Sequence, residues 1–432
     1  MLRPAFCFCL LAALGFAFLS PARGEDDFER EPISYSKEKP KNRVTQLLED
    51  VTAGKKTLQY DDHFGYLKSL LSELGIKTST QTLVFSKTSL QRQKIAPQSP
   101  RSLYFADDAY IGFCQQGDVL EISAVDPQLG AVFYTLDQEK SSPPKIIRQT
   151  DNCLICHGSS HTKGVPGHMI RSVYTDVMGM PILSGGSYRI DQTSPFEQRW
   201  GGWYVTGKHG DQKHLGNLVI RGREVPRELD NSAGQNVVSL DSKIELKDYL
   251  TPHSDIAALM VLEHQAEAHN LLTRANYVTR QAMAYEAALN KEVGNPPNHR
   301  WASTTSRIKS VTEPLVEYFL YCEEAPLKSR IEGTSNFAAE FSAPGPRDKA
   351  GRSLRDLDLE KRLFKYPCSY LIYSESFRTL PEETKQIILR RLYDVVSGQD
   401  QAEKFAHLSA ADRQAIREIV RDTLPGLPDY WK

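Results

Sequence analysis

The chain has 432 residues, of which 40% are hydrophobic and 25% charged, as is typical of a soluble globular protein with two or three domains. Its formal net charge of −1 provides no excess of positive charge for binding a polyanion, so we expect no nucleic-acid partner.

Residues 1–24 have the pattern of a secretory signal peptide. Arg3 is followed by an unbroken apolar run over 5–19, and Ala22 and Gly24 are the small residues expected before a cleavage site. As a helix this run would be about 22 Å long, short of the roughly 30 Å hydrocarbon core of a membrane. We therefore expect export to a periplasmic or other extracytoplasmic compartment, with no transmembrane segment in the mature chain.

The next segments are a leader and a helix. Residues 25–43 carry many charges together with Pro32 and Pro40, a composition typical of a flexible leader. A helical stripe of apolar residues then extends from Asp61 to Leu74, and Gly75 is the expected stop.

Residues 44–145 are expected to be rich in β-structure. Five short runs of β-branched and aromatic residues, separated by turn residues, predict a small antiparallel sheet. These runs are TLVF (82–85), SLYFA (102–106), AYIGFC (109–114), VLEISAV (119–125) and AVFYTL (131–136).

Residues 146–240 are rich in glycine and loops. Three strands are expected within them, namely SYRI (187–190), GGWYVT (201–206) and NLVIR (217–221).

Residues 241–432 are expected to be mainly helical. A long helix should extend from Ser254 to Val293 and end at Gly294. Two more helices are expected near the end of the chain, the second opened by a capping box of Ser409 and Asp412. The remaining expected segments are a loop over 332–351 and these two helices, over 381–398 and 409–424. The fold class is therefore α+β, with a β-rich N-terminal part, a loop-rich middle segment and a helical C-terminal part.

Cys153, Cys156 and His157, within DNCLICHGSS (151–160), form a C-x-x-C-H motif. At this chain's own Cys and His frequencies, roughly 0.003 such matches are expected by chance. A zinc site needs four ligands, usually from two such knuckles, and the chain has no second C-x-x-C. A redox dithiol usually opens a helix in a βαβ unit, which is not expected here, and it does not need the histidine.

Covalent haem attachment, in contrast, uses all three residues. Two cysteines at i and i+3 lie on one helical turn and can reach the two vinyl groups, while the adjacent histidine falls under the iron. The motif therefore predicts one covalent haem c, held in the segment 146–240.

CLICHG resembles the haem-attachment segment of the c-type cytochromes. The resemblance implies that Cys153 and Cys156 form the thioether bonds and that His157 is the proximal ligand. Over most of its mature length, the chain is also similar to a family of large exported monohaem proteins with no assigned reaction. The similar segments are VFSKTSLQ, PRSLYFADD, RWGGWYVTGKHG, LMVLEHQAEAHNLLTRANY and YPCSYLIYSESF.

The sixth iron ligand is not fixed by any motif. We favour His214, because its loop follows the GGWYVT strand in the same glycine-rich region as the haem motif. Met180 competes because it precedes a proline, a context common at cytochrome ligands. The remaining alternatives are His209, His264, His269, or an open position.

Aromatic and histidine pairs offer further sites. Trp200, Trp203 and Tyr204 are candidates for walling the haem edge, with ordinary core packing as the alternative. A second metal held by His209, His214 and a histidine of the long helix is a weaker hypothesis.

Five cysteines remain in the mature chain, an odd number that argues against a full disulfide framework. The sequence leaves open whether Cys322 pairs with Cys368.

One-electron transfer to a redox partner protein is the function we expect. The main alternative is a haem enzyme, such as a peroxidase or a small-substrate oxidase, because 432 residues exceed what carrying one electron needs. A haem-containing interaction protein of a larger complex is the second alternative.

Overall fold

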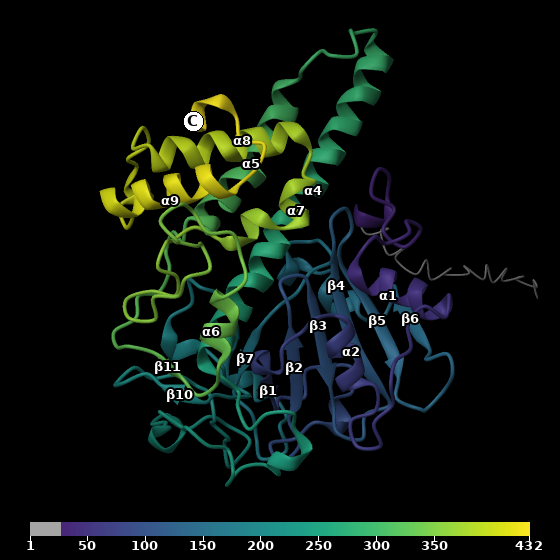
Figure 1. The fold of residues 1–432 in the computed structure, drawn as a ribbon, viewed down its shortest axis with the longest axis vertical. Coiled ribbons are helices and arrows are strands. Elements are labelled where there is room, and N and C mark those ends of the chain that lie inside the picture. Colours follow the sequence, from purple (N-terminus) through teal and green to yellow (C-terminus); the bar gives the residue numbers. More distant parts are fainter. Residues whose placement is uncertain (1–26) are drawn as a thin grey trace, which may run out of the picture.

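The computed structural model describes residues 27–432, so the predicted signal peptide over 1–24 lies outside the described residues. Within the described range, nine α-helices and a seven-stranded antiparallel sheet form an α+β fold (Figure 1). The predicted fold class is confirmed. None of the helices in this range is long and apolar enough to cross a membrane.

The main sheet has the strand order β6-β5-β4-β3-β2-β1-β9. Its strands are β1 (Thr82–Val84), β2 (Arg101–Phe105), β3 (Ala109–Phe113), β4 (Val119–Asp126), β5 (Gly130–Asp137), β6 (Ile146–Gln149) and β9 (Trp203–Tyr204). The first five confirm the five predicted runs. The edge strands β6 and β9 come from the loop-rich segment, which therefore shares the sheet of the N-terminal part.

Two small antiparallel strand pairs complete the β-structure of the described residues. They are β7 (Arg171–Val173) with β8 (Ser187–Arg189), and β10 (Gly207–Lys208) with β11 (Glu332–Gly333). The strand predicted over 217–221 is wrong, because Ile220 makes only an isolated bridge to Asp176.

The helices of the described residues agree in part with the predictions. They are α1 (Arg43–Thr52), α2 (Leu67–Glu73), α3 (Leu154–His157), α4 (Ile256–Val293), α5 (Ala302–Phe319), α6 (Phe337–Ser342), α7 (Glu375–Arg378), α8 (Glu382–Val396) and α9 (Ala410–Thr423).

The long helix α4 is confirmed, and it ends at Gly294 in the left-handed conformation with φ 73°. The capping box of Ser409 and Asp412 is also present. Helix α2 is shorter than predicted, since Asp61 and Gly65 pair in a tight turn instead. The loop predicted over 332–351 contains β11 and α6.

The flexible leader predicted over 25–43 does not hold for its described part. Ile33 and Tyr35 have no exposed surface, and the Tyr35 hydroxyl donates a hydrogen bond to the carbonyl of Ala131 in β5 (2.8 Å). Burial of these apolar side chains against the sheet stabilises an ordered conformation, although the charged composition of the segment predicts flexibility.

The two faces of the sheet are covered differently. Helices α1 and α2 overlie one face, where strand residues such as Ile111 and Ile122 join their apolar side chains in one core cluster (Figure 1). Alternate residues, including Phe105 and Phe133, point to the other face, since successive strand side chains alternate. Helix α4 and the segment that carries α3 cover this second face.

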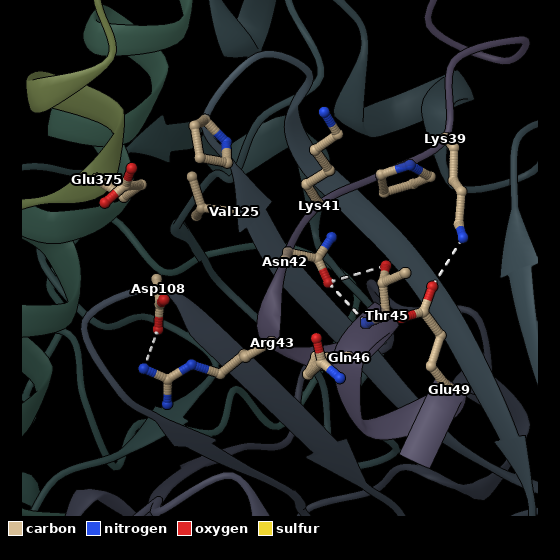
Figure 2. Close-up of a pocket in the computed structure, with 12 residues that line it drawn as sticks. Lys39, Lys41, Asn42, Arg43, Thr45, Gln46, Glu49, Asp108, Val125 and Glu375 are labelled. Atoms are coloured by element: carbon tan, nitrogen blue, oxygen red, sulfur yellow. Dashed lines mark hydrogen bonds and ion pairs between the residues drawn. The ribbon is translucent and has the colours of Figure 1, made fainter. Parts of the chain in front are cut away.

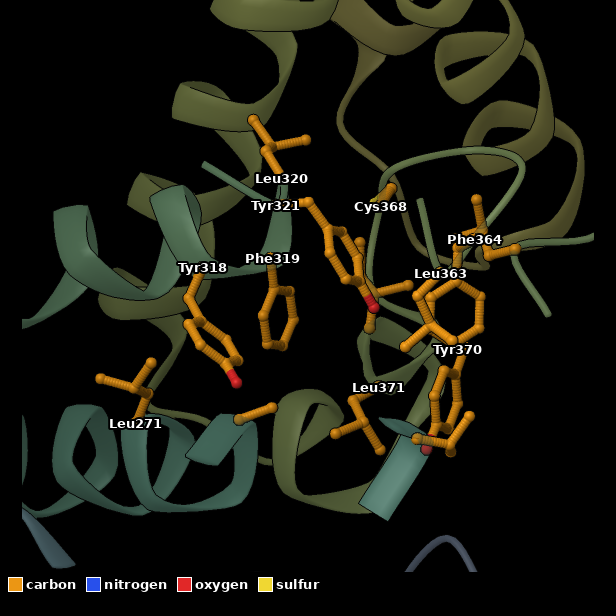
Figure 3. Packing of buried hydrophobic residues seen from close by; sticks show 14 of the residues in the cluster. Leu271, Tyr318, Phe319, Leu320, Tyr321, Leu363, Phe364, Cys368, Tyr370 and Leu371 are labelled. Atoms are coloured by element: carbon orange, nitrogen blue, oxygen red, sulfur yellow. The ribbon is translucent and has the colours of Figure 1, made fainter. Parts of the chain in front are cut away.

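The largest core lies between α4, α5 and the C-terminal helices. Figure 3 shows part of its aromatic centre, where Tyr321 packs against Phe364 (5.6 Å) and Phe364 packs against Tyr370 (5.8 Å). The pairs α4–α5, α5–α8 and α8–α9 pack against one another in sequence. This layered core fixes α4, and α4 in turn supports the segment that carries the C-x-x-C-H motif.

Candidate functional site

The C-x-x-C-H motif forms one short helical turn. Cys153 directly precedes α3, and the backbone N–H of His157 donates to the carbonyl of Cys153 (2.9 Å). Cys153 is partly buried and Cys156 is exposed. Ile155 between them is 68% exposed, although it is a large apolar residue. The two thiols therefore lie on one turn beside an uncovered apolar side chain.

His157 is held in one orientation and one tautomer. Its Nδ1 lies 2.9 Å from the carbonyl oxygen of Gly167, and a carbonyl can only accept, so Nδ1 carries the proton. Nε2 is then the nitrogen with a free lone pair, which is the form that binds a metal. The ring packs on Phe133 of β5 at a centroid distance of 4.8 Å.

Burial is the main cause that lowers the pKa of His157, and the hydrogen bond to Gly167 opposes it. The charges of Arg101 and Glu121 also act on the ring, in opposite directions. The imidazole is therefore neutral near pH 7 and available as a ligand.

Asn270 of α4 fixes the loop that supplies the Gly167 carbonyl. Its Oδ1 accepts from the backbone N–H of His168 (2.9 Å), and its Nδ2 donates to the carbonyl of His168 (2.7 Å). A Cβ added to Gly167 would lie 2.1 Å from this Oδ1, so glycine allows the close approach. Thr162 also donates to the carbonyl of Val165 (2.7 Å) within the same loop.

A stripe of polar residues on α4, formed by Glu263, Glu267 and Asn270, is buried, and it anchors the segment around the motif. Glu263 pairs with Arg199 (2.9 Å), with both side chains almost fully buried. Glu267 pairs with Lys163 (3.0 Å), one turn before Asn270. These partners all lie between residues 163 and 199, so the stripe binds the loop-rich segment rather than solvent.

The environment of Cys153 argues against a redox dithiol. Burial raises the pKa of Cys153 to about 11, with Glu121 adding to the effect, whereas a reactive dithiol needs a thiolate near neutral pH. All five cysteines of residues 27–432 are unpaired, including the buried Cys322 and Cys368. No group of three or more His, Cys, Asp or Glu side chains in that range is arranged to hold a metal ion.

His214 is arranged differently from His157. Its ring contacts His209 at 4.6 Å and Trp200 at 5.2 Å, while the ring of His157 packs on Phe133. Its Nδ1 accepts from the backbone N–H of Gly216 (3.0 Å), which places the proton of the neutral ring on Nε2. Burial, and then the neighbouring His209, lower the pKa of His214 to about 3. Neither ring nitrogen is therefore presented as a free ligand.

The other proposed ligands are engaged elsewhere or exposed. Both ring nitrogens of His264 are hydrogen-bonded, to Gln192 (2.6 Å) and Ser369 (2.8 Å), and Nε2 of His269 bonds the carbonyl of Asp107 (2.7 Å). These are core histidines.

Nε2 of His209 accepts from the backbone N–H of Asn236 (3.0 Å). Met180 is 51% exposed in a surface turn.

The tryptophans proposed to wall the haem edge have other neighbours. Trp200 is fully buried and packs edge-on against Phe196 (5.0 Å). Trp203 belongs to β9, and its indole N–H donates to the carbonyl of Arg171 (2.7 Å). Both belong to the protein core.

Sequence reasoning missed the residues that support the motif from a distance. Besides Gly167 and Asn270, these include His168, whose Nε2 lies 2.7 Å from the hydroxyl of Ser123 and whose ring packs on Tyr110 at 4.3 Å. The only sequence signal was that Asn270 belongs to a polar stripe on an otherwise apolar helix.

A separate pocket of about 570 Å³ opens beside the start of α1, and Figure 2 shows its lining. Its charges are largely paired with one another: Lys39 bonds Glu49 (2.7 Å) and Arg43 bonds Asp108 (2.7 Å). None of the residues predicted to form the functional site lines it.

Comparisons with protein-family models, with curated proteins and with solved structures gave no match to this chain. The interpretation of the site around α3 therefore rests on its own geometry and chemistry.

Proposed function

We propose that the protein is an exported c-type cytochrome that carries one covalent haem and transfers single electrons to a partner protein. The observation that supports this most is the orientation of His157. Its Nδ1–H is fixed on Gly167, its Nε2 is free, and both thiols lie on the same helical turn.

Each residue of the proposed site would have a separate role. Cys153 and Cys156 would attach the group through thioether bonds, and His157 would hold the iron from one side. Asn270 keeps the Gly167 carbonyl in place, so it orients His157. Haem supplies a one-electron carrier when bound. Cys156 and Ile155 are exposed, so an attached haem would have one edge near the surface, where a redox partner could approach.

The attachment can be tested on a denaturing gel stained for haem. The wild-type protein should stain, and Cys153→Ala combined with Cys156→Ala should abolish the stain. The matched control is Cys322→Ala with Cys368→Ala, which removes two buried free thiols and should leave the stain intact. Extraction of haem from the wild type by acidified organic solvent would refute covalent attachment.

A haem enzyme remains the second candidate, favoured by one observation. Arg101 and Glu121 form a charged pair whose charges reach His157, and such groups beside an iron can assist chemistry on a bound molecule. Optical spectra of the oxidised and reduced protein, with and without carbon monoxide, separate the two. A reduced form that binds carbon monoxide at once favours the enzyme, and an unchanged low-spin spectrum favours electron transfer.

A further inference from the structure

An ion pair lies on the same face of the sheet as the motif. Nη2 of Arg101 in β2 is 2.6 Å from Oε2 of Glu121 in β4, and the two side chains are only 17% and 15% exposed. Gln91 adds a hydrogen bond from its Nε2 to the other carboxylate oxygen (3.2 Å). The carboxylate is thus fixed on both oxygens.

The sheet makes room for this pair. Gly112 of β3 stands directly opposite Glu121, between β2 and β4. A Cβ at Gly112 would lie 2.3 Å from Nη2 of Arg101, so the guanidinium crosses the sheet over this glycine. Nε of Arg101 is buried and has no hydrogen-bond partner. The guanidinium therefore retains an unsatisfied donor on the covered face of the sheet.

The order of contacts along β5 shows where the ring of His157 lies. The N–H of Ala131 donates to the carbonyl of Pro166 (3.0 Å), so the supporting loop lies at that end of the strand. The ring of His157 packs on Phe133, two residues further along β5. Thr135, two residues further on the same face, pairs with Glu121.

Nδ1 of His157 is engaged by Gly167, beside Pro166, and the side chains of Arg101 and Glu121, in the row next to Phe133, are close enough for their charges to act on the ring. An iron bound to Nε2 would therefore lie within reach of the same charges.

We propose that Arg101 and Glu121 line the iron side of His157 and set the reduction potential of the haem through their opposite charges. This inference rests on the proposed haem function. The oxidised iron carries one more positive charge than the reduced iron, so a nearby carboxylate favours the oxidised form and a guanidinium favours the reduced form. Both side chains act through their charges, which solvent screens only weakly because the side chains are partly buried.

The test is a spectroelectrochemical titration of purified variants. Glu121→Gln should raise the reduction potential, and Arg101→Gln should lower it. The double variant should return close to the wild-type value, because both charges are gone. Arg101→Lys keeps the charge and should also stay close to the wild type, which separates the charge from the packing of the arginine.

The matched control is the Arg391–Glu313 pair (2.9 Å) between α8 and α5, away from the sheet (Figure 1). Glu313→Gln and Arg391→Gln should shift the potential by less than the test variants. Shifts of the same sign in Glu121→Gln and Arg101→Gln, or shifts no larger than those of the control pair, would overturn the inference. Haem staining of each variant separates the two claims, since an unstained wild type refutes covalent haem, and stained variants without opposite shifts refute only the role of this pair.

Discussion

Asn270 of α4 bonds both backbone groups of His168, accepting from its N–H at 2.9 Å and donating to its carbonyl at 2.7 Å. A helix residue 102 positions away thus fixes the loop whose Gly167 carbonyl orients His157. The stability of the motif's surroundings and the orientation of His157 therefore depend on the same amide.

Asn270→Ala should lower the free energy of unfolding by about 1–3 kcal/mol, because it leaves two buried backbone groups without partners. It should also broaden the haem spectrum, since His157 loses its fixed partner. Denaturant unfolding and the optical spectrum measure the two effects. Asn276→Ala is the control on the same helix, because its amide makes only long contacts, donating to the carbonyl of Pro127 (3.4 Å) and accepting from Arg280 (3.3 Å). An equal spectral change in both variants would contradict the role given to Asn270.

The buried pair of Arg199 and Glu263 predicts a large loss of stability when one partner is removed. Arg199→Met should cost about 3–5 kcal/mol, because Glu263 is left buried without its partner. Burial already holds the pKa of Glu263 well above its usual range, and Arg199 opposes this. Adding Glu263→Leu should recover much of the loss, as an apolar pair carries no desolvation cost.

The contrast for this pair is Lys39→Met, which breaks an exposed ion pair with Glu49. Its cost should stay below about 1 kcal/mol. Urea unfolding of all four proteins gives the comparison, and a loss in Arg199→Met no larger than that in Lys39→Met would contradict the prediction.

The buried histidines of α4 predict a loss of stability in acid. Burial lowers the pKa of His264 to about 3 and that of His269 to about 4, from 6.5. Between pH 6.5 and 4 the unfolded chain therefore binds protons that the folded chain does not. The free energy of unfolding should be unaffected by these groups above pH 6.5, and should fall by about 1.4 kcal/mol per pH unit for each histidine below it.

Unfolding curves at pH 7, 6 and 5 measure this slope. His264→Gln should reduce the slope by about one proton. The same substitution at His299, whose side chain is exposed, should retain the wild-type slope. An unchanged slope in His264→Gln would show that this histidine takes up its proton in the folded state.

Local patterns predicted the elements whose information is local. The β-branched and aromatic runs of residues 82–136, and the turns between them, predicted β1 to β5, and Gly294 marked the end of α4. The C-x-x-C-H motif was recognisable because its three residues lie within one turn. The edge strand β9 lies within the predicted GGWYVT strand, but the edge strand β6 was not predicted, since a strand of four residues is defined by its neighbour rather than by its own sequence.

The support of the site depends on contacts that sequence spacing does not reveal. The two-residue period of a strand shows which of its residues share a face, but not which residues of neighbouring strands meet. Only the register of β2, β3 and β4 brings Arg101 and Glu121 together over Gly112. The polar stripe of α4 was visible in the sequence, but its partners between Lys163 and Arg199 depend on the tertiary fold.

The last prediction concerns the sixth iron position, for which the sequence favoured His214. In the structure the Nδ1 of His214 accepts a hydrogen bond from the N–H of Gly216, so the proton of the neutral ring lies on Nε2. His157 has the opposite arrangement, with the proton on Nδ1 and Nε2 free. A ligand role for His214 would need its tautomer reversed and the bond to Gly216 lost, at a cost of about 1–3 kcal/mol.

We therefore expect His214→Ala to lower stability, because it removes a buried ring from Trp200 and His209, but to leave the spin state of the haem unchanged. Met180→Leu tests the exposed methionine, and loss of a weak band near about 695 nm in that variant would assign it as the ligand. Spectra of the oxidised proteins, recorded beside their unfolding curves, separate loss of a ligand from loss of packing. Conversion to a high-spin spectrum in His214→Ala, with an unchanged spectrum in Met180→Leu, would identify His214 as the ligand, because loss of the iron ligand changes the spin state directly.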